Sequence, residues 1–343
     1  MRINKSFSPP LFFVACMVMA VFFNVACAQN NDLWLSMKPS KSIDKSKKIV
    51  LIAGDEEYRS EESLPMLAKI LTHHHGFHTV VLFPINPKTK LIDPAYQQNI
   101  PGLEALKDAD LVVFATRFRQ LPDDQMQWID SYLKAGKPVI GLRTATHGFN
   151  FPADVKSAYA HYSYNTAKGP WEGGFGRLVL GETWIDHHGD HGTEGTRAIN
   201  NGIEQAAGNP LLRGVNDVWV PSDVYGIRNR SSDIKVLLYG QPTLGMDATA
   251  AINQKKSIMP VAWTKEYQIP EGKKGKAFTT TMGSAVDFLN EDLRRLFVNA
   301  CYWGLGLEGS IPEEAKVDFL HPFTPTMFGF GTYIKGKVPQ DYQ

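Results

Sequence analysis

Leu111-Val-Val-Phe-Ala115 and Val139-Ile-Gly-Leu142 are two short runs that are apolar throughout, with an amphipathic segment, Pro122 to Ala135, between them. Strands without polar alternation are typical of a parallel sheet that is buried on both faces. Gly136-Lys137-Pro138 ends the helix and allows the chain to return to the sheet. The stretch therefore predicts a strand, a helix and a second strand parallel to the first.

Other apolar runs extend this pattern into one α/β domain with a mostly parallel sheet and helices on both faces. Further strands are expected at 48–54, 78–83, 177–184, 234–239, 260–263 and 276–281, and helices at 60–75, 102–107, in parts of 152–166, and at 287–304. A β-rich insertion near residues 171–240 is expected to cover the carboxyl ends of the strands, an edge here called the crest. Ligands bind at that edge in such sheets, so Arg143, Thr144 and His147 are candidate site residues.

Several segments together resemble the ThuA-like (trehalose-utilisation) family in its secreted bacterial form. They are Gly141-Leu-Arg-Thr-Ala-Thr-His147, Trp171-Glu-Gly-Gly-Phe-Gly-Arg177, Asp186-His-His-Gly-Asp-His-Gly192, Ser222-Asp-Val-Tyr-Gly226 and Phe278-Thr-Thr-Thr-Met-Gly283. The resemblance covers residues 48–308 and implies a flavodoxin-like fold of the class I glutamine-amidotransferase type. It also implies a role in carbohydrate metabolism.

Two positions depart from what these resemblances imply. Amidotransferases of this fold carry a nucleophilic cysteine where this chain has Arg143, and a guanidinium cannot form a thioester. The chain is therefore not expected to be a glutamine amidotransferase. Relatives often carry a histidine where this chain has Ser284, which is retained as a candidate substrate-binding residue.

The N-terminus predicts a signal peptide over residues 1–28 and export to the periplasm or beyond. Arg2 and Lys5 precede the apolar run 11–23, and small residues follow at Val25-Ala-Cys-Ala28. Cys27 leaves a lipoprotein as the alternative, with contact to a membrane only through the signal or that lipid. A polar linker (29–47), the main domain (48–308) and a C-terminal arm lying over the body (309–343) are expected to follow.

Charge and cysteine content narrow the function further. The chain has 36 basic and 35 acidic residues, which favours a small neutral carbohydrate as partner and argues against nucleic acid. Cys301 is the one cysteine beyond the signal, and its apolar helical setting predicts a buried side chain without a catalytic part. The histidines at 73–75 are expected in the last turn of a helix, facing water.

The loop Asp186-His187-His188-Gly189-Asp190-His191 has the highest density of polar side chains in the chain. Imidazole and carboxylate groups serve as general acids and bases and also as ligands of transition metals. We take Asp186, His188 and His191, together with His147, as candidate catalytic residues. A divalent metal held by His187, His188 and His191 is a less favoured alternative, and no other cofactor is indicated.

The candidate substrate-binding residues gather in the predicted crest loops and in the aromatic turn near residue 171. Arg117 and Arg119 could instead form ion pairs with Asp123 and Asp124. The full substrate-binding set is Asp55, Glu56, Tyr58, Arg117, Arg143, Thr144, Trp171, His187, Asp223, Tyr225 and Ser284.

Three functions remain open from the sequence. The first is an enzyme acting by general acid–base chemistry on a sugar or a keto-sugar glycoside, as a hydrolase, lyase or isomerase. The second is a carbohydrate-binding protein without catalysis, and the third is a metal-dependent hydrolase using the histidine loop.

Overall fold

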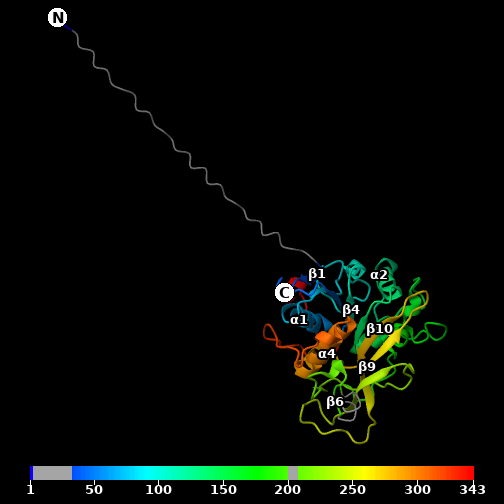
Figure 1. Cartoon of the computed structure of the whole chain (residues 1–343). Coiled ribbons are helices and arrows are strands. Elements are labelled where there is room, and N and C mark those ends of the chain that lie inside the picture. Colours follow the sequence, from blue (N-terminus) through cyan, green and yellow to red (C-terminus); the bar gives the residue numbers. More distant parts are fainter. Residues whose placement is uncertain (3–32, 200–207) are drawn as a thin grey trace. The chain divides into compact units, whose positions relative to one another are not determined.

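The structure is a computed structural model that describes residues 1–2, 33–199 and 208–343 (Figure 1). Nearly all of the predicted signal peptide, including Cys27, therefore lies outside the described residues. Among the described residues, no helix combines the length and apolarity needed to cross a bilayer.

One ten-stranded sheet runs through the domain, in the order β1-β3-β2-β4-β5-β10-β9-β8-β6-β7. Its central strands are parallel: β3 (His78–Leu82), β2 (Lys48–Gly54), β4 (Leu111–Thr116), β5 (Val139–Leu142) and β10 (Gly275–Thr280). The predicted strand-helix-strand unit over residues 111–142 is confirmed, and with it the α/β fold class.

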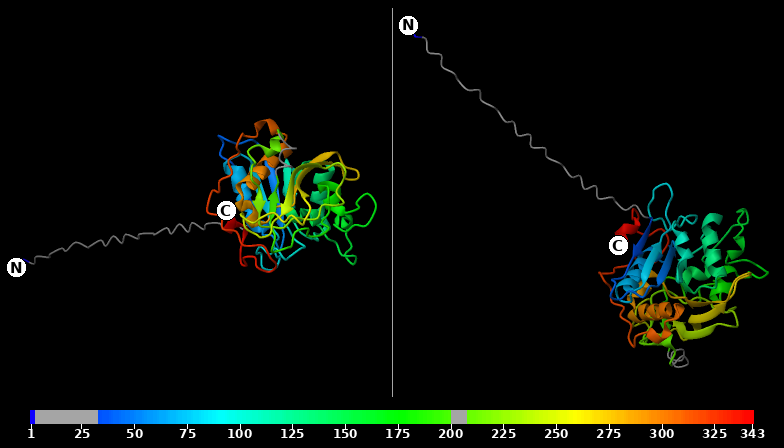
Figure 2. Two further views of the ribbon diagram at one scale, coloured as in Figure 1. Left: turned by 90° about the horizontal axis from the view of Figure 1, so that it is seen from below. Right: turned by 45° about the horizontal axis from the view of Figure 1, so that its top comes forward.

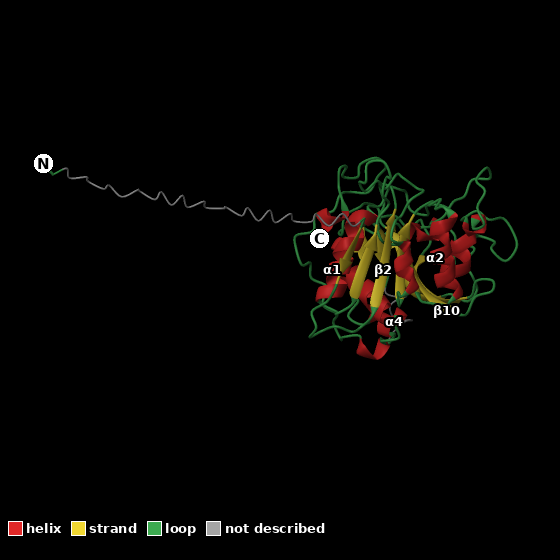
Figure 3. Cartoon of the chain, turned by 90° about the horizontal axis from the view of Figure 1, so that it is seen from above, coloured by secondary structure: helices red, strands yellow, loops and turns green. Residues whose placement is uncertain are grey.

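Within the described residues, the α-helices α1, α2 and α4 cover the two faces of the sheet (Figure 3). Apolar residues of α1 (Ser60–His73) and α4 (Glu291–Gly304) share one core with Ile49, Leu51 and Ala53 of β2. The alternate residues of β2, Val50 and Ile52, share the other core with α2 (Asp123–Lys134). Strands whose successive side chains enter opposite cores must be apolar throughout, which is why the sequence shows no polar alternation.

Beyond β10 the sheet continues as an antiparallel wing of four strands, whose arrangement is visible in two further views (Figure 2). These strands are β9 (Met259–Tyr267), β8 (Lys235–Pro242), β6 (Thr196–Ala198) and β7 (Trp219–Val220). The strands of the β-rich insertion thus extend the sheet, and the loops between them supply the part of the insertion that lies over the crest. Pairing along the edge satisfies the backbone groups of these strands, so only the loops between them reach the crest.

The predicted polar linker at 29–47 contributes an ordered strand. Residues Trp34–Met37 form β1, which pairs antiparallel with β3 and buries Leu35. Leu33, Trp34 and Met37 also pack against the two cores, so this part of the segment belongs to the folded domain.

Short helices occur within the loops that connect these elements. The predicted strand at 177–184 is instead a π-helix, η4 (Gly176–Leu180), whose Leu180 side chain occupies the space beside Gly141 of β5. The region 152–166 contains only one short helical turn. The 3-10 helices are η1 (Leu103–Lys107), η2 (Arg143–His147), η3 (Ala160–Tyr162), η5 (Pro210–Leu212), η6 (Ala285–Leu289), η7 (Glu308–Ser310) and η8 (Pro339–Tyr342).

Two side chains near the C-terminal helix bear on the sequence predictions. Cys301 is fully buried in α4, as predicted, and its burial raises the pKa of the thiol well above the ordinary value. His75 does not face water: its ring contacts the Tyr302 hydroxyl and the Lys316 carbonyl, and burial lowers its pKa to about 4. The C-terminal segment passes over the end of α1, where the carbonyls of Lys316 and Asp318 contact His75 and His74.

Candidate functional site

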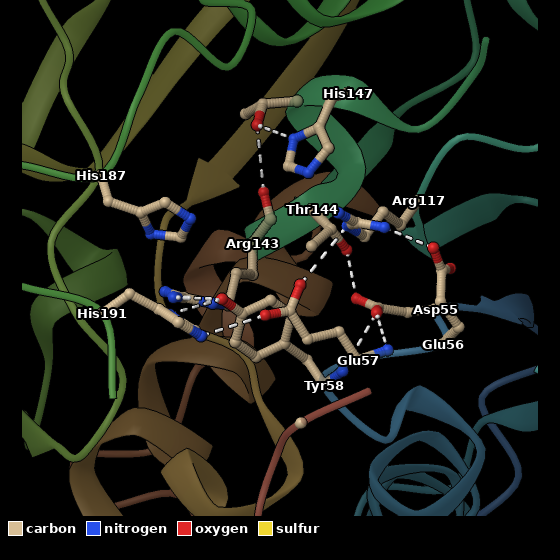
Figure 4. Close-up of polar contacts among 12 residues, drawn as sticks. Asp55, Glu56, Glu57, Tyr58, Arg117, Arg143, Thr144, His147, His187 and His191 are labelled. Atoms are coloured by element: carbon tan, nitrogen blue, oxygen red, sulfur yellow. Dashed lines mark hydrogen bonds and ion pairs between the residues drawn. The ribbon is translucent and has the colours of Figure 1, made fainter. Parts of the chain in front are cut away.

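The crest loops bring together a polar cluster that includes Tyr58, Arg143, His187 and His191 (Figure 4). Its centre is Asp223, which the insertion supplies. The Asp223 carboxylate is fully buried, and it contacts three cationic or ionisable groups. Its Oδ1 accepts a hydrogen bond from Arg143 Nη2 at 2.8 Å and lies 3.1 Å from His191 Nδ1. Its Oδ2 lies 2.6 Å from His187 Nδ1. These three contacts hold the pKa of Asp223 well below its ordinary value against the opposing effect of burial.

His187 forms a dyad with Asp223. The backbone of His187 pairs with that of Tyr225, so the two loops of the insertion present the ring and the carboxylate together. Only Nδ1 of His187 contacts Asp223, so Nε2 is the nitrogen that can meet a ligand, and the side chain is 32 % exposed. An imidazole fixed in this way by a carboxylate has its second nitrogen available to take a proton.

His191 lies between two carboxylates. Its Nδ1 faces Asp223, and its Nε2 is 3.2 Å from Glu57 Oε1. Hydrogen bonds to these two groups raise the pKa of His191 to about 9, so the ring is cationic at neutral pH. The centroids of the His187 and His191 rings are 4.7 Å apart. A basic nitrogen and a cationic ring are therefore neighbours at the crest.

Arg143 supports this cluster from below and does not face a ligand. Its guanidinium donates to the Asp223 carbonyl, the Thr281 carbonyl and the Tyr58 hydroxyl, in addition to the Asp223 carboxylate. It also lies between the rings of Tyr58 and Tyr225, with Cζ 4.1 and 4.4 Å from the two centroids. With 1 % exposure, Arg143 positions Asp223, and the structure favours that role over direct substrate binding.

The loops after β2 and β4 add a second layer of charge. Glu56 pairs with Arg117 and, at 2.8 Å, with Arg119, while Glu57 lies 3.4 Å from Arg117 Nε. The alternative pairing of these arginines with Asp123 and Asp124 is wrong, because both arginines turn toward the crest. Glu56, Glu57 and Asp223 thus each have an arginine partner before any imidazole takes a proton.

Asp55 and Thr144 join the loop after β2 to η2, which follows β5, through a 2.5 Å hydrogen bond from Thr144 Oγ1. The Asp55 carboxylate also accepts hydrogen bonds from the backbone amides of Glu57 and Tyr58. These bonds fix the turn that carries the Glu57 and Tyr58 side chains. Burial raises the pKa of Asp55. Both residues lie at the crest as predicted, where they shape the loop.

His147 sits beside the cluster in an aromatic cage. Its ring is within 5.3 Å of the rings of Phe118 and Trp184 and 6.0 Å from Tyr225, measured between centroids. Burial, with two nearby arginines, lowers the pKa of His147 well below its ordinary value. His147 is therefore a neutral wall of the site and not a proton donor.

Four predicted site residues point elsewhere. His188 Nε2 contacts the carbonyl of Ser257 at 2.8 Å, and Asp186 pairs with Arg228 at 2.6 Å. Trp171 packs against Tyr162 in the α2 core, and Ser284 caps η6 through the amide of Asp287. In a loop interrupted by Gly189, neighbouring histidines turn to opposite sides, which sequence spacing alone does not reveal.

Sequence reasoning missed two contributors. Glu57 supplies the second carboxylate of His191, although it lies in a loop already chosen for Asp55, Glu56 and Tyr58. Phe328 of the C-terminal arm lies 5.3 Å from the ring of Tyr58 and 5.7 Å from that of His191. The arm was expected to lie over the body, but no pattern identified which residue would touch the site.

The same residues define the group best suited to hold a metal ion. Ligand atoms of His187, His191 and Asp223 all lie within 4.8 Å of one another, whereas His188 does not take part. Two imidazoles and a carboxylate are a donor set that transition metals accept. The predicted metal set of three histidines therefore changes to two histidines and Asp223.

Comparison with known proteins gives one family and a set of distant folds. Residues 50–304 match the family model described as ThuA, trehalose utilisation. A ThuA-like protein from Parabacteroides merdae is 14 % identical, with a TM-score of 0.47, and the match covers 87 % of this chain and 99 % of that one. PurLQS from Thermotoga maritima is 10 % identical, with a TM-score of 0.37 and coverage of 78 % and 99 %. No curated protein matches the chain in sequence.

Proposed function

The chain belongs to the ThuA family, which is linked to trehalose utilisation and carbohydrate metabolism. From this premise we propose that the protein acts on a sugar or a keto-sugar glycoside by general acid–base chemistry. The observation that carries the proposal is the His187–Asp223 dyad at the crest, with a 2.6 Å contact between Nδ1 and Oδ2. We further propose, from the N-terminal sequence, that the protein is exported.

In this proposal His187 is the general base. Asp223 accepts the Nδ1 proton and so selects the tautomer in which Nε2 carries the lone pair. Nε2 can then remove a proton from a sugar hydroxyl, or from a carbon next to a keto group. Because Arg143 fixes Asp223 through two hydrogen bonds of 3.0 and 2.8 Å, the base is held in place before substrate binds.

His191 supplies the complementary charge. The cationic ring lies beside the base, where removal of a proton from the substrate leaves negative charge on a neighbouring oxygen. A preorganised cation stabilises that charge in the transition state more than in the ground state. The same ring can return a proton to the oxygen that leaves when its Nε2 hydrogen moves from Glu57 to that oxygen, which leaves the ring neutral and still hydrogen-bonded to Asp223 through Nδ1.

A metal-dependent hydrolase is the second candidate, because His187, His191 and Asp223 converge. Charge balance favours the acid–base alternative. Asp223 is already paired with Arg143, and Glu57 with Arg117, so a divalent ion would bring two unbalanced positive charges into a largely buried cluster. A proton on His191 adds only one positive charge, where a divalent ion would add two, and the His191 ring is partly exposed to solvent.

The test is a screen of the purified chain against disaccharides and methyl glycosides, each in native and keto form, read by mass spectrometry. We expect turnover that persists in a strong chelator. His187→Asn keeps a donor near Asp223 but has no basic nitrogen, so kcat should fall about 100-fold or more. His188→Asn is the matched control from the same loop and should retain nearly full activity.

Each contrary outcome identifies a different alternative. Complete inhibition by the chelator that added zinc or manganese reverses would replace the proposal with the metal-dependent hydrolase. Saccharide binding without turnover of any panel member would instead support a carbohydrate-binding protein. Equal turnover by the His187 variant and wild type would reject the dyad as the catalytic group.

A further inference from the structure

Part of the C-terminal arm is fastened to the crest by its backbone. The Thr326 amide donates to Glu62 Oε2 at 2.7 Å, and the Gly329 amide donates to the Glu57 carbonyl at 2.9 Å. The guanidinium of Arg59 donates to the Gly329 carbonyl and to the Thr332 hydroxyl. In Figure 4 the reddish ribbon of the arm passes next to the loop that carries Tyr58. These contacts hold residues 326–332 in place independently of their apolar side chains.

The fastened segment places two aromatic rings at the site in different ways. Phe328 turns inward onto Tyr58 and His191, with centroid separations of 5.3 and 5.7 Å. Phe330 turns outward and is 58 % exposed, with the Arg117 guanidinium 5.0 Å from its centroid. Gly329, between them, has φ of +146°, which a residue with a side chain rarely adopts. The chain conformation thus places one ring against Tyr58 and His191 and the other against Arg117.

A large aromatic ring left exposed on a well-anchored backbone calls for a physical reason. Burying Phe330 would be favourable, yet its neighbours hold it beside a guanidinium and a carboxylate at the crest. Apolar ring faces next to hydrogen-bonding groups suit a pyranose, which has an apolar face of C–H groups and a rim of hydroxyls. Arg117 would meet those hydroxyls while the ring covers the face.

We propose that Phe328 and Phe330 form the aromatic wall of the substrate site, against which a saccharide ring packs, so that the C-terminal arm determines substrate affinity. This inference rests on the proposed function, because it takes the ligand to be a carbohydrate. It adds that recognition comes from residues beyond 50–304, the part of the chain that matches the family model.

The experiment measures binding and turnover separately in the full chain. Trehalose and each saccharide that wild type turns over are titrated by calorimetry, and KM and kcat are measured for the latter. Phe330→Ala should weaken binding and raise KM about tenfold, with kcat changed much less, because the ring contacts the sugar and not the reacting atoms. Phe330→Trp should restore the affinity. Ile334→Ala is the matched control, since it removes another exposed apolar side chain of the same arm.

The possible failures are distinguishable. Unchanged affinity in Phe330→Ala, when wild type binds a saccharide, overturns the aromatic wall and leaves the proposed function standing. Absence of binding to every saccharide by wild type overturns the proposed function and the wall with it. A change of oligomeric state in Phe330→Ala with unchanged saccharide affinity would assign the exposed ring to self-association and also overturn the wall. Phe328→Ala serves as a second variant, and its melting temperature shows whether the arm remains folded.

Discussion

Replacing Arg143 with lysine tests whether this residue supports the site or binds the ligand. Lysine keeps the positive charge but offers one ammonium group in place of a planar fork. In the structure, Nη1 and Nη2 of Arg143 serve four acceptors at 2.8–3.0 Å, and the guanidinium stacks between two tyrosine rings. A single ammonium cannot occupy both nitrogen positions, so at least one buried acceptor loses its donor.

The cost follows from these contacts. An unsatisfied buried acceptor costs about 1–3 kcal/mol, and loss of the stacked guanidinium adds about 1 kcal/mol. The sum, about 2–4 kcal/mol, corresponds to a fall in melting temperature of about 3–6 °C for a domain of this size. The loosened Asp223 should also lower kcat, because His187 loses its fixed partner. Substrate affinity should change less than twofold, since the buried guanidinium does not reach the ligand.

For Arg143→Lys, calorimetric melting gives the melting temperature, ligand titration gives the substrate affinity, and steady-state kinetics give kcat. Arg228→Lys is the control, because that arginine forms a half-exposed pair with Asp186, and exposed pairs contribute little to stability. The reasoning is refuted if Arg143→Lys melts like wild type but binds substrate at least tenfold more weakly. That result would return Arg143 to the role of a direct substrate ligand.

Three further predictions concern buried or charged groups. Cys301→Ser should lower the melting temperature but keep kcat within a few-fold of wild type, and inactivation by alkylation of the folded protein would contradict this. Burial without a hydrogen-bond partner raises the pKa of Glu61 from 4.5 to about 8, so the folded state favours the protonated acid. The stability it contributes, up to about 5 kcal/mol, should be complete below pH 4.5 and lost as pH rises to 8. Urea unfolding of Glu61→Gln should lack this pH dependence, and an unchanged dependence would show that another group causes it. The rate should fall as pH rises through about 9, where His191 loses its proton, in the presence or absence of chelator. Glu57→Gln should move that fall to lower pH, and an unmoved alkaline limb would remove His191 from the mechanism.

The parallel centre of the sheet could be predicted because burial on both faces leaves a direct mark on sequence. Residues 111–115 and 139–142 are apolar throughout, and no surface element of this length would be. The helix expected at 287–304 forms as α4 from Glu291 onward, where Asn290 caps it by accepting from the Leu293 amide. The π-helix at 176–180 could not be predicted, because its apolar residues fit a buried strand and a buried helical turn equally well.

Within the site, the sequence indicated the loops more reliably than the residues. Asp223, His187 and His191 come from the predicted loops and do converge. His188 and Asp186, between and beside them, do not, because the direction of a side chain in a loop depends on backbone angles that sequence does not fix. Arg143 illustrates a second limit, since its position at the crest indicated importance but not that its guanidinium would be buried.

The turn at Arg143 has a structural role in this chain, where amidotransferases of this fold have a nucleophilic cysteine. Arg143 has φ of +40°, in the left-handed region that costs a non-glycine residue about 1–2 kcal/mol. Such strain persists only where the surroundings determine it, and here the guanidinium joins three otherwise separate loops through Tyr58, Thr281 and Asp223. In the amidotransferases that the fold resembles, the same turn presents a reactive cysteine. In this chain the turn fastens the loops instead, and under the proposed function the reacting groups are those that it positions through Asp223, His187 and His191. Loss of the fork should therefore loosen several loops together, which no single loop substitution would do.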